Sequence, residues 1–183
     1  MRVIAGDFKG RRLKAVPGQN TRPTTDKVKE SIFNIIGPYF DGGHCLDLYA
    51  GSGALSIEAV SRGIEHAVLV DKQYKAVKTI HENVELTRAP DRFQVEKKSA
   101  SQALSMLENS GQAFDLVFLD PPYANQQIEK DIQWMEEHQL LNDGAVVVCE
   151  TAEETVLPSS IKGLVKIKEN QYGTIRITVY EKE

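Results

Sequence analysis

The segment Asp120–Tyr123, with the sequence DPPY, follows the apolar run 116–119 and combines residue types that can grip a planar amino group. Proline lacks an N–H and fixes φ, so Pro121 and Pro122 end the strand that the apolar run predicts and hold one backbone shape. The segment then presents a carboxylate, carbonyl oxygens that face outward and an aromatic ring. These groups suit the binding of an amino-bearing ring whose nitrogen must meet an electrophile. The simpler interpretation is a turn that only terminates a strand.

A second set of residues predicts where a cofactor binds. Residues 45–49 read as a short buried strand, and Gly51 and Gly53 follow it before a helical pattern. Glycines between a strand and a helix let the backbone approach a ligand closely. Asp71 lies 18 residues after Gly53 at the end of the next apolar run, where its carboxylate can accept hydrogen bonds from both ribose hydroxyls of a nucleoside. A G-x-G pair alone more often marks a tight turn, and its combination with Asp120–Tyr123 makes the interpretation specific.

Strands and helices are expected to alternate along the chain and to position these residues. The apolar spacing predicts strands at 44–49, 66–71, 92–97, 114–120, 145–149, 165–169 and 174–180, and helices at 53–62, 73–87, 99–109 and 126–138. Such alternation is typical of the α/β class, a mostly parallel sheet with helices on both faces. Ligands of these sheets bind beyond the carboxyl ends of the strands. We therefore expect Asp47, Gly51, Gly53, Asp71 and Asp120 to converge there.

The first 40 residues differ from the rest in pattern and charge. Residues 2–16 read as a glycine-rich β-hairpin ended by Pro17-Gly18, and Thr25 or Asp26 caps a helix that stops at Gly37-Pro38. These 40 residues have eight basic and three acidic side chains, a net charge of +5, so the remainder has −9 within the total of −4. A local basic surface attracts phosphate even on an acidic protein.

The basic residues of this arm are candidate RNA contacts, although they also fit a mobile, solvated N-terminus. The candidates are Lys9, Arg11, Arg12, Lys14, Arg22 and the neighbouring Thr24. Arg22 can face a phosphate or the carboxylate of a cofactor. A turn that leads into the helix explains Arg22 and Thr24 equally well.

Two pairs of segments in the chain resemble known enzymes. Residues 47–53 (DLYAGSG) together with Asp120–Tyr123 look like the class I S-adenosylmethionine-dependent methyltransferases that act on exocyclic amino groups. Residues 22–30 (RPTTDKVKE), with 6–13 (GDFKGRRL) before them, are similar to the bacterial 16S ribosomal RNA guanine-N2 methyltransferases. That family modifies the guanine known as position 966. The likeness covers essentially the whole chain.

The resemblance implies a fold, a cofactor and a site. The fold would be Rossmann-like, with a seven-stranded, mostly parallel sheet and an antiparallel C-terminal strand. S-adenosylmethionine would be the cofactor, and the 16S rRNA of the small subunit would be the substrate of a monomeric, cytoplasmic enzyme. Catalytic contacts would come from Asp120, Pro121, Pro122 and Tyr123, and cofactor contacts from Asp47, Tyr49, Gly51, Gly53, Asp71, Lys72, Ser99 and Ala100. The Asp120 carboxylate and the Pro121 carbonyl would accept the N–H groups of guanine N2, and Tyr123 would stack on a base that is unpaired or flipped.

Two other functions share these residues. The first keeps the chemistry but changes the substrate to the N6 of a DNA adenine or the amide of a protein glutamine. The chain shows no additional target-recognition segment for DNA, and a glutamine substrate would leave the basic arm without a purpose. The second is a non-catalytic RNA-binding assembly factor with the same fold. The presence of Asp120, Tyr123 and Asp71 argues against such a loss of activity.

The bulk properties fit one domain over residues 1–183, with 1–40 as an extension. A hydrophobic content of 41% and a charged content of 26% are ordinary for a globular protein. No run approaches the roughly 18 apolar residues that span a bilayer, and the N-terminus lacks the apolar segment of a signal peptide. Cys45 and Cys149 lie in apolar runs, which predicts reduced core residues of a cytosolic protein. No Cys/His grouping has the spacing of metal ligands, so no metal is expected.

Overall fold

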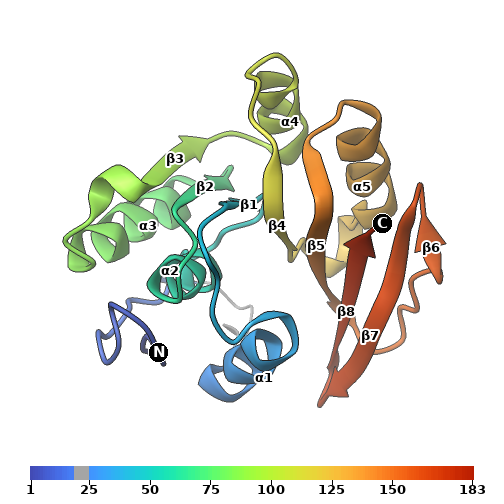
Figure 1. Ribbon diagram of the computed structural model, residues 1–183. Coiled ribbons are helices and arrows are strands. Elements are labelled where there is room, and N and C mark those ends of the chain that lie inside the picture. Colours follow the sequence, from blue (N-terminus) through green and yellow to red (C-terminus); the bar gives the residue numbers. More distant parts are fainter. Residues whose placement is uncertain (19–24) are drawn as a thin grey trace.

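The computed structural model describes residues 1–18 and 25–183 (Figure 1). Its helices are α1 (Asp26–Ile36), α2 (Ala54–Ser61), α3 (Tyr74–Leu86), α4 (Ala100–Glu108) and α5 (Ile128–Glu137). Its strands are β1 (His44–Asp47), β2 (His66–Asp71), β3 (Phe93–Lys97), β4 (Phe114–Leu119), β5 (Leu141–Ala152), β6 (Ser160–Ile161), β7 (Leu164–Tyr172) and β8 (Ile175–Lys182). Short 3₁₀ helices lie at Pro90–Arg92 and Tyr123–Asn125.

The strands form one sheet in the order β3-β2-β1-β4-β5-β8-β7-β6. Strands β1 to β5 pair in parallel, and β8, β7 and β6 add antiparallel. The chain runs outward from β1 through β2 to β3 and then returns to place β4 on the other side of β1. This reversal creates a switch point between β1 and β4, where open α/β sheets bind ligands. The predicted α/β class is confirmed, with one strand more than the seven expected, because the two-residue β6 is too short to leave an apolar pattern.

The helices cover both faces of the sheet. Alternate strand residues point to opposite faces, so each buried strand serves two hydrophobic clusters. One cluster packs α1, α2 and α3 against side chains such as Leu69 and Phe118, and the other packs α4 and α5 against side chains such as Val70 and Leu119. This double burial explains why the strands read as nearly continuous apolar runs. Cys45 and Cys149 are free and fully buried, as predicted.

The predicted N-terminal hairpin is present in a short form and is docked on α2. An antiparallel bridge joins Arg2 and Arg12, and residues 1–3 and 10–13 exchange three backbone hydrogen bonds of 2.8 to 2.9 Å. Beyond this pairing, the N–H groups of Ile4 and Ala5 donate to the side chain of Glu58 on α2. Gly6 has a φ of +88°, and a Cβ at this position would lie 1.9 Å from the carbonyl oxygen of Ser61. Close approach to α2 therefore requires glycine here, and the strand pairing stays short.

The structure confirms one predicted element boundary and moves another. Thr25 is the N-cap of α1, and its hydroxyl oxygen accepts a hydrogen bond from the N–H of Val28 at 3.2 Å, as its residue type predicts. Strand β5 begins at Leu141, four residues before the predicted start. The β4–β5 register shifts between the pairs Phe114–Leu141 and Leu116–Val146, so the strand continues past an irregularity that contains the turn-like residues 142–144.

Among the described residues, no helix is long and apolar enough to cross a membrane.

Candidate active site

Four acidic residues meet at the carboxyl ends of neighbouring strands. Asp47 ends β1, Asp71 ends β2, Asp120 follows β4, and Glu150 lies near the carboxyl end of β5. The strands are parallel, so these ends lie at the same edge of the sheet. Electrostatic coupling joins Asp47 to Asp71 and Asp120 to both Asp47 and Glu150. The structure thus brings the two sequence-predicted segments together.

Asp71 fixes the backbone of the glycine loop between β1 and α2. One carboxylate oxygen of Asp71 accepts a hydrogen bond from the N–H of Gly51 at 3.0 Å, and the other accepts one from the N–H of Gln73 at 2.9 Å. Gly51 has a φ of +58° and open space where a Cβ would lie. A carboxylate offers about four lone-pair sites, so Asp71 keeps acceptor capacity for a diol. This combination fits a nucleoside cofactor bound over the loop.

Gly53 serves packing rather than ligand approach. It is the left-handed residue that begins α2, with a φ of +83°. A Cβ at Gly53 would lie 3.0 Å from a methyl group of Leu69 and 3.6 Å from Ile80. Gly53 is therefore required so that α2 and α3 can pack closely behind the loop.

Asp47 is buried directly beneath the glycine loop. It is 2% exposed and accepts a hydrogen bond from the hydroxyl of Ser56 at 2.9 Å. Burial raises the pKa of Asp47 to about 7, the hydrogen bonds from Ser56 and from the backbone of Tyr49 oppose this rise, and Asp71 adds to it. A nearby cation strongly stabilises the ionised form of a buried carboxyl group whose pKa is raised. The site therefore fits the positively charged amino group of an amino acid moiety.

Tyr49 connects the glycine loop to the helix that follows the DPPY segment. Its hydroxyl donates a hydrogen bond of 2.6 Å to the carboxylate of Asp131 on α5. Burial, followed by the interaction with Asp131, raises the pKa of the Tyr49 phenol. Asp131 is 7% exposed and was not singled out from the sequence, because an acid on an amphipathic helix has no distinctive pattern. This bond links the predicted cofactor loop with the predicted substrate side.

Ser99 and Ala100 lie where β3 leads into α4. The Ser99 hydroxyl accepts a hydrogen bond from the N–H of Gln102, and the Gln102 side chain accepts one from the N–H of Ser99, which forms a capping box. Ala100 begins the helix, and the first N–H groups of a helix lack intrahelical partners. A ring nitrogen of a cofactor can therefore accept a hydrogen bond from one of these backbone N–H groups. Lys72 is exposed at the end of β2.

The DPPY segment forms a rigid rim at the end of β4. Pro121 is buried, Pro122 has φ −55° and ψ 136°, and Tyr123 begins a 3₁₀ turn. The Tyr123 ring is 50% exposed. Partial burial and the nearby charges of Glu150 and Asp120 raise the pKa of Tyr123 to about 12, so its phenol is neutral at physiological pH. An exposed neutral ring beside the partly buried Asp120 is a suitable surface for stacking a base.

Asp120 and Glu150 form a carboxyl pair that sequence analysis did not predict. Burial raises the pKa of Asp120 well above its usual range, and the charge of Glu150, a hydrogen bond with Glu150 and the charge of Asp47 add to this. Glu150 is 7% exposed. Glu150 directly follows the apolar run predicted as a strand at 145–149, and this position is a detectable signal, because acidic residues are almost never fully buried without a partner.

The basic arm lies beside α3, and its side chains differ in availability. Lys9 and Arg12 are exposed, and the ammonium group of Lys14 lies 3.2 Å from Glu82 at the surface. The Arg11 guanidinium donates to the carbonyl of Thr87 at 2.7 Å and lies over the ring of Phe8, so Arg11 has a structural role in the arm. The predicted contacts Arg22 and Thr24 fall outside the described residues.

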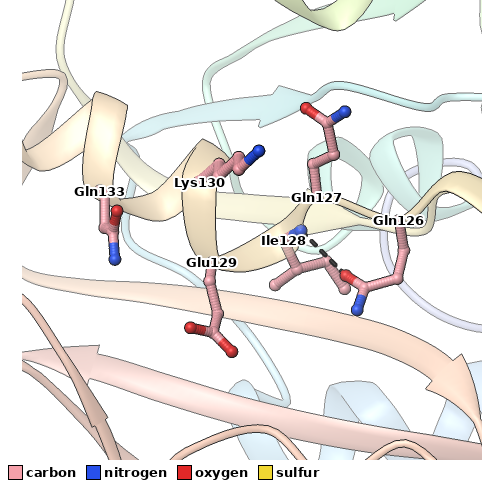
Figure 2. A pocket seen from close by; sticks show the side chains of 6 residues that line it. All are labelled: Gln126, Gln127, Ile128, Glu129, Lys130 and Gln133. Atoms are coloured by element: carbon pink, nitrogen blue, oxygen red, sulfur yellow. Dashed lines mark hydrogen bonds between the residues drawn. The ribbon is translucent and has the colours of Figure 1, made fainter.

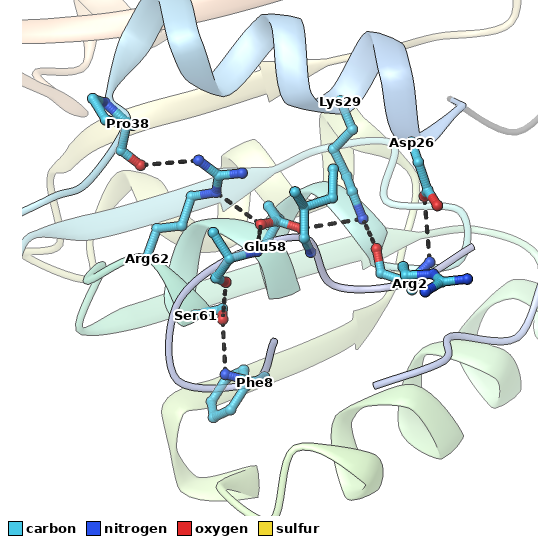
Figure 3. A network of polar contacts seen from close by, with 10 residues as sticks. Arg2, Phe8, Asp26, Lys29, Pro38, Glu58, Ser61 and Arg62 are labelled. Atoms are coloured by element: carbon cyan, nitrogen blue, oxygen red, sulfur yellow. Dashed lines mark hydrogen bonds and ion pairs between the residues drawn. The ribbon is translucent and has the colours of Figure 1, made fainter. Parts of the chain in front are cut away.

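A buried ion cluster fixes the arm to the body of the protein (Figure 3). Glu58 lies between Lys29 of α1 and Arg62, the C-cap of α2, with O···N distances of 3.2 Å and 2.7 Å. The Lys29 ammonium also donates to the carbonyl of Arg2 at 2.6 Å. Burial lowers the pKa of Lys29, and the charge of Glu58 opposes this. Glu58 therefore has a structural role and joins the arm, α1 and α2.

An open hollow of about 610 Å³ follows the DPPY segment in the chain (Figure 2). Its lining residues are Gln126, Gln127, Ile128, Glu129, Lys130 and Gln133. None of the predicted catalytic or cofactor residues lines it. The hollow is a surface feature of the start of α5, distinct from the strand ends where the acids and glycines meet.

Comparison with known proteins identifies relatives along the full length of the chain. The family described as "Conserved hypothetical protein 95" matches residues 1–181. A Bacillus subtilis protein named "Putative rRNA methyltransferase YlbH" is 46% identical and covers 100% of this chain and 99% of its own length. The Escherichia coli (strain K12) protein named "Ribosomal RNA small subunit methyltransferase D" is 32% identical, covering 100% of this chain and 90% of its own.

A solved structure agrees with the sequence relatives. It is that of a conserved hypothetical protein from Streptococcus pyogenes, 48% identical, with a TM-score of 0.82. It covers 85% of this chain and 96% of its own. Relatives at this level share the fold and the order of the elements that form the site.

Proposed function

The chain belongs to the family described as "Conserved hypothetical protein 95", and we propose from this premise that it methylates the N2 amino group of one guanine in 16S rRNA, with S-adenosylmethionine as cofactor. Relatives named rRNA methyltransferases cover its whole length. The observation that supports the proposal most directly is the meeting of the glycine loop and Asp71 with Asp120–Tyr123 at one edge of the sheet.

The cofactor site is assigned to the strand ends β1, β2 and β3. Asp71 accepts the ribose hydroxyls, the backbone at Gly51 lies under the amino acid moiety, and Asp47 supplies the negative charge for its amino group. The N–H of Ala100 donates to the adenine, and Tyr49, Lys72 and Ser99 complete the cofactor site. Gly53 contributes indirectly, because it lets the loop pack closely on Leu69 and Ile80. S-adenosylmethionine supplies a methyl group on a sulfonium, which is already a strong electrophile.

The residues of the DPPY segment bind and orient the target amino group. The Asp120 carboxylate and the Pro121 carbonyl accept hydrogen bonds from its two N–H groups, which favours lone-pair density on the nitrogen. Pro122 holds the backbone shape, and Tyr123 stacks on the base, a contact worth about 1–3 kcal/mol in single-strand binders. The main contribution of the protein is alignment, because the reacting atoms must lie in line.

The basic arm is proposed to hold the RNA backbone. Lys9, Arg12 and Lys14 are exposed on the segment that packs against α3, and phosphate contacts position a nucleic acid without reading its sequence. Arg22 and Thr24 lie outside the described residues and are proposed as further RNA contacts from the sequence alone, and Arg11 supports the arm through the carbonyl of Thr87. The target base must be unpaired or flipped to reach Asp120. We propose a monomeric, cytoplasmic enzyme that acts on the rRNA of the small subunit or of an assembly intermediate.

The test is transfer of a labelled methyl group from S-adenosylmethionine to 16S rRNA, and to small subunits, from cells that lack this protein. Nucleoside mapping should find N2-methylguanosine at one position. Label in N6-methyladenosine would refute the choice of target atom. An absence of label in any RNA, with cofactor still bound, would favour the non-catalytic assembly factor instead.

A further inference from the structure

Tyr74 is an exposed aromatic residue at the rim of the proposed site. It begins α3, shortly after Asp71 at the end of β2, and it is 68% exposed. The carboxylate of Asp71 accepts hydrogen bonds from the N–H groups of both Gly51 and Gln73, so it ties the start of α3 to the glycine loop. Tyr74 therefore lies beside the cofactor loop, at the same edge of the sheet as Tyr123.

Two lysines accompany Tyr74 on the exposed side of α3. Lys75 is the next residue, and Lys78 lies one turn further on, where residues i and i+4 of a helix are neighbours. Both lysines are exposed, and within the described part of the chain neither takes part in an ion pair. Glu82, the first acid of α3, lies 3.2 Å from the ammonium group of Lys14 in the arm. The charges of Lys75 and Lys78 are thus available to an anionic ligand.

The basic arm runs along the same helix toward Tyr74. The backbone of Lys14 is bound to the side chain of Asn83, near the carboxyl end of α3. Further along the arm, a Cβ at Gly18 would lie 3.8 Å from the ammonium nitrogen of Lys75, near the start of α3. A helix rises about 1.5 Å per residue, so the two helix positions are on the order of 12 Å apart. The arm therefore leads from its own cations to those beside Tyr74.

Tyr74 and Tyr123 lie on opposite sides of the switch point. Tyr74 follows β2, Tyr123 follows β4, and β1 lies between these strands (Figure 1). Neighbouring strands are about 4.8 Å apart, so the ends of β2 and β4 are separated by roughly 10 Å. A short stretch of single-stranded RNA spans such a distance. Cations that follow the backbone, combined with exposed rings on which bases stack, are the means by which proteins bind single-stranded nucleic acids.

This inference rests on the proposed function, because it concerns the RNA that contains the target guanine. We propose that Tyr74 stacks on an unpaired nucleotide that flanks the target, and that Lys75 and Lys78 bind the phosphates beside it. Tyr123 receives the target base itself, and the arm binds the RNA backbone further from the site. The two tyrosines then hold the strand in a fixed direction across the edge of the sheet.

The proposed contact selects the form of the RNA rather than its sequence. Every base has a face on which a ring can stack, so Tyr74 favours unpaired over paired RNA without reading which base is present. Phosphate contacts of Lys75 and Lys78 likewise position the strand and carry no sequence information. Recognition of the target amino group remains with Asp120–Tyr123.

Substitutions of Tyr74 test the stacking contact with a single-stranded RNA oligonucleotide of mixed sequence as the probe. Tyr74→Ala should weaken binding about 5- to 100-fold, the range that base–aromatic stacking contributes. Tyr74→Phe keeps the ring and should bind nearly as wild type. Tyr39→Ala is the matched control, because Tyr39 is 63% exposed but lies at the opposite edge of the sheet, before β1. Filter binding at one salt concentration measures the affinities, and circular dichroism reports whether each variant is folded.

The two lysines are tested by the salt dependence of the same binding. Gln substitutions at Lys75 and Lys78 should reduce the magnitude of the slope of log affinity against log salt by about 1.4, because each phosphate contact with a single strand contributes about 0.7. Gln substitutions at Lys162 and Lys168 remove the same charge outside this surface and should leave the slope unchanged. Equal slopes for the two pairs would refute the phosphate contacts.

Three outcomes would overturn the role of Tyr74. Tyr74→Ala could bind the oligonucleotide as tightly as wild type, which would exclude stacking whether or not the protein transfers a methyl group. Weaker binding of S-adenosylmethionine by Tyr74→Ala in the absence of RNA would place the ring in the cofactor site instead. A defect found only with assembled small subunits, and not with RNA alone, would assign Tyr74 to a protein contact.

Failure of the proposed function gives a different result. If Tyr74→Ala loses affinity for single-stranded RNA while Tyr39→Ala does not, and the wild type methylates no RNA, the RNA-binding surface stands. The proposed methyl transfer is then the part that fails.

Discussion

Asn83 holds the backbone of Lys14 from both sides. Its side-chain oxygen accepts a hydrogen bond from the N–H of Lys14 at 2.8 Å, and its amide nitrogen donates to the Lys14 carbonyl at 2.9 Å. The same nitrogen donates to the carbonyl of Ser52 in the glycine loop at 2.9 Å. One fully buried amide on α3 thus joins the proposed RNA-binding arm to the proposed cofactor loop.

Replacement of Asn83 should lower both the stability of the protein and its affinity for the cofactor. Asn83→Ala leaves the Lys14 and Ser52 groups without their partner, a loss of about 1–3 kcal/mol for each buried group left unsatisfied. Asn83→Asp should be more harmful, because a carboxylate cannot donate to either carbonyl. Chemical denaturation and titration with S-adenosylmethionine measure the two effects. A loss of stability with unchanged cofactor affinity would show that Asn83 does not shape the loop.

The raised pKa of Asp47 predicts that its ionisation lowers the stability of the protein but strengthens cofactor binding. The native state holds the proton of Asp47 up to about pH 7, whereas an unfolded aspartate releases it near its ordinary pKa of 3.8. In this interval the native state binds more protons, so stability falls as the pH rises. Asp47→Asn removes this cost and should stabilise the protein at pH 8 by roughly 1–3 kcal/mol, as measured by denaturation.

Cofactor affinity should respond to Asp47 in the opposite direction. In the wild type the affinity for S-adenosylmethionine should increase from pH 6 to pH 7.5, because ionised Asp47 attracts the amino group of the cofactor. In Asp47→Asn the affinity should be weaker and nearly flat over this interval. Calorimetric titration at several pH values measures both. A variant that binds as tightly as wild type would remove Asp47 from the cofactor site.

Substitution of Asp120 should affect methyl transfer but not cofactor binding. Asp120→Ala removes the acceptor for the target amino group and should abolish methyl transfer, while the affinity for S-adenosylmethionine stays nearly unchanged. Labelled transfer and equilibrium binding are the measurements. Loss of both activities together would instead place Asp120 in the cofactor site.

Local sequence was sufficient for the parts of the site that lie on one segment. The DPPY motif ends its strand by proline chemistry, and the glycines follow β1 as strand-to-helix turns do. Convergence of Asp47, Asp71 and Asp120 then follows from the topology rule for parallel sheets. The hydrogen bond from Gly51 to Asp71 is consistent with this rule, because both lie at carboxyl ends of paired strands.

The residues that connect distant segments could not be predicted in this way. Asn83 is 69 positions from Lys14, and Glu58 is 54 from Ile4, and each lies on a helix that carries other polar residues as well. Their roles depend on which backbone groups the arm leaves unpaired, and this is decided by docking on α2 and α3. The predicted hairpin forms only over residues 1–3 and 10–13 for the same reason, since the next N–H groups, those of Ile4 and Ala5, donate to Glu58.

The exposed side chains of the arm should set the salt dependence of RNA binding. Replacing Lys9, Arg12 and Lys14 by Gln removes up to three phosphate contacts, and each contact contributes about 0.7 to the slope of log affinity against log salt for single strands. The slope should therefore fall by about 2 in magnitude. Arg11 is left intact because it binds the carbonyl of Thr87.

A matched control distinguishes the effect of this surface on the salt slope from the effect of net charge alone. Gln substitutions at Lys162, Lys168 and Lys130 also remove three positive charges, but outside the arm. These variants should leave the slope close to that of wild type. Equal slopes for the two sets, or no change in the arm variant, would exclude the arm as the main phosphate-binding surface.

Glu58 should be the residue on which the docking of the arm depends most. Its two oxygens accept from the N–H groups of Ile4 and Ala5 and lie against Lys29 and Arg62, all in the protein interior. Glu58→Ala leaves two buried cations without their counter-charge and should destabilise the protein by about 3–5 kcal/mol in urea denaturation. Glu137→Ala, which removes an exposed carboxylate 3.7 Å from Lys162, should change stability little. If Glu58→Ala were as stable as this control, the cluster would not hold the arm, and the RNA-binding surface would need another anchor.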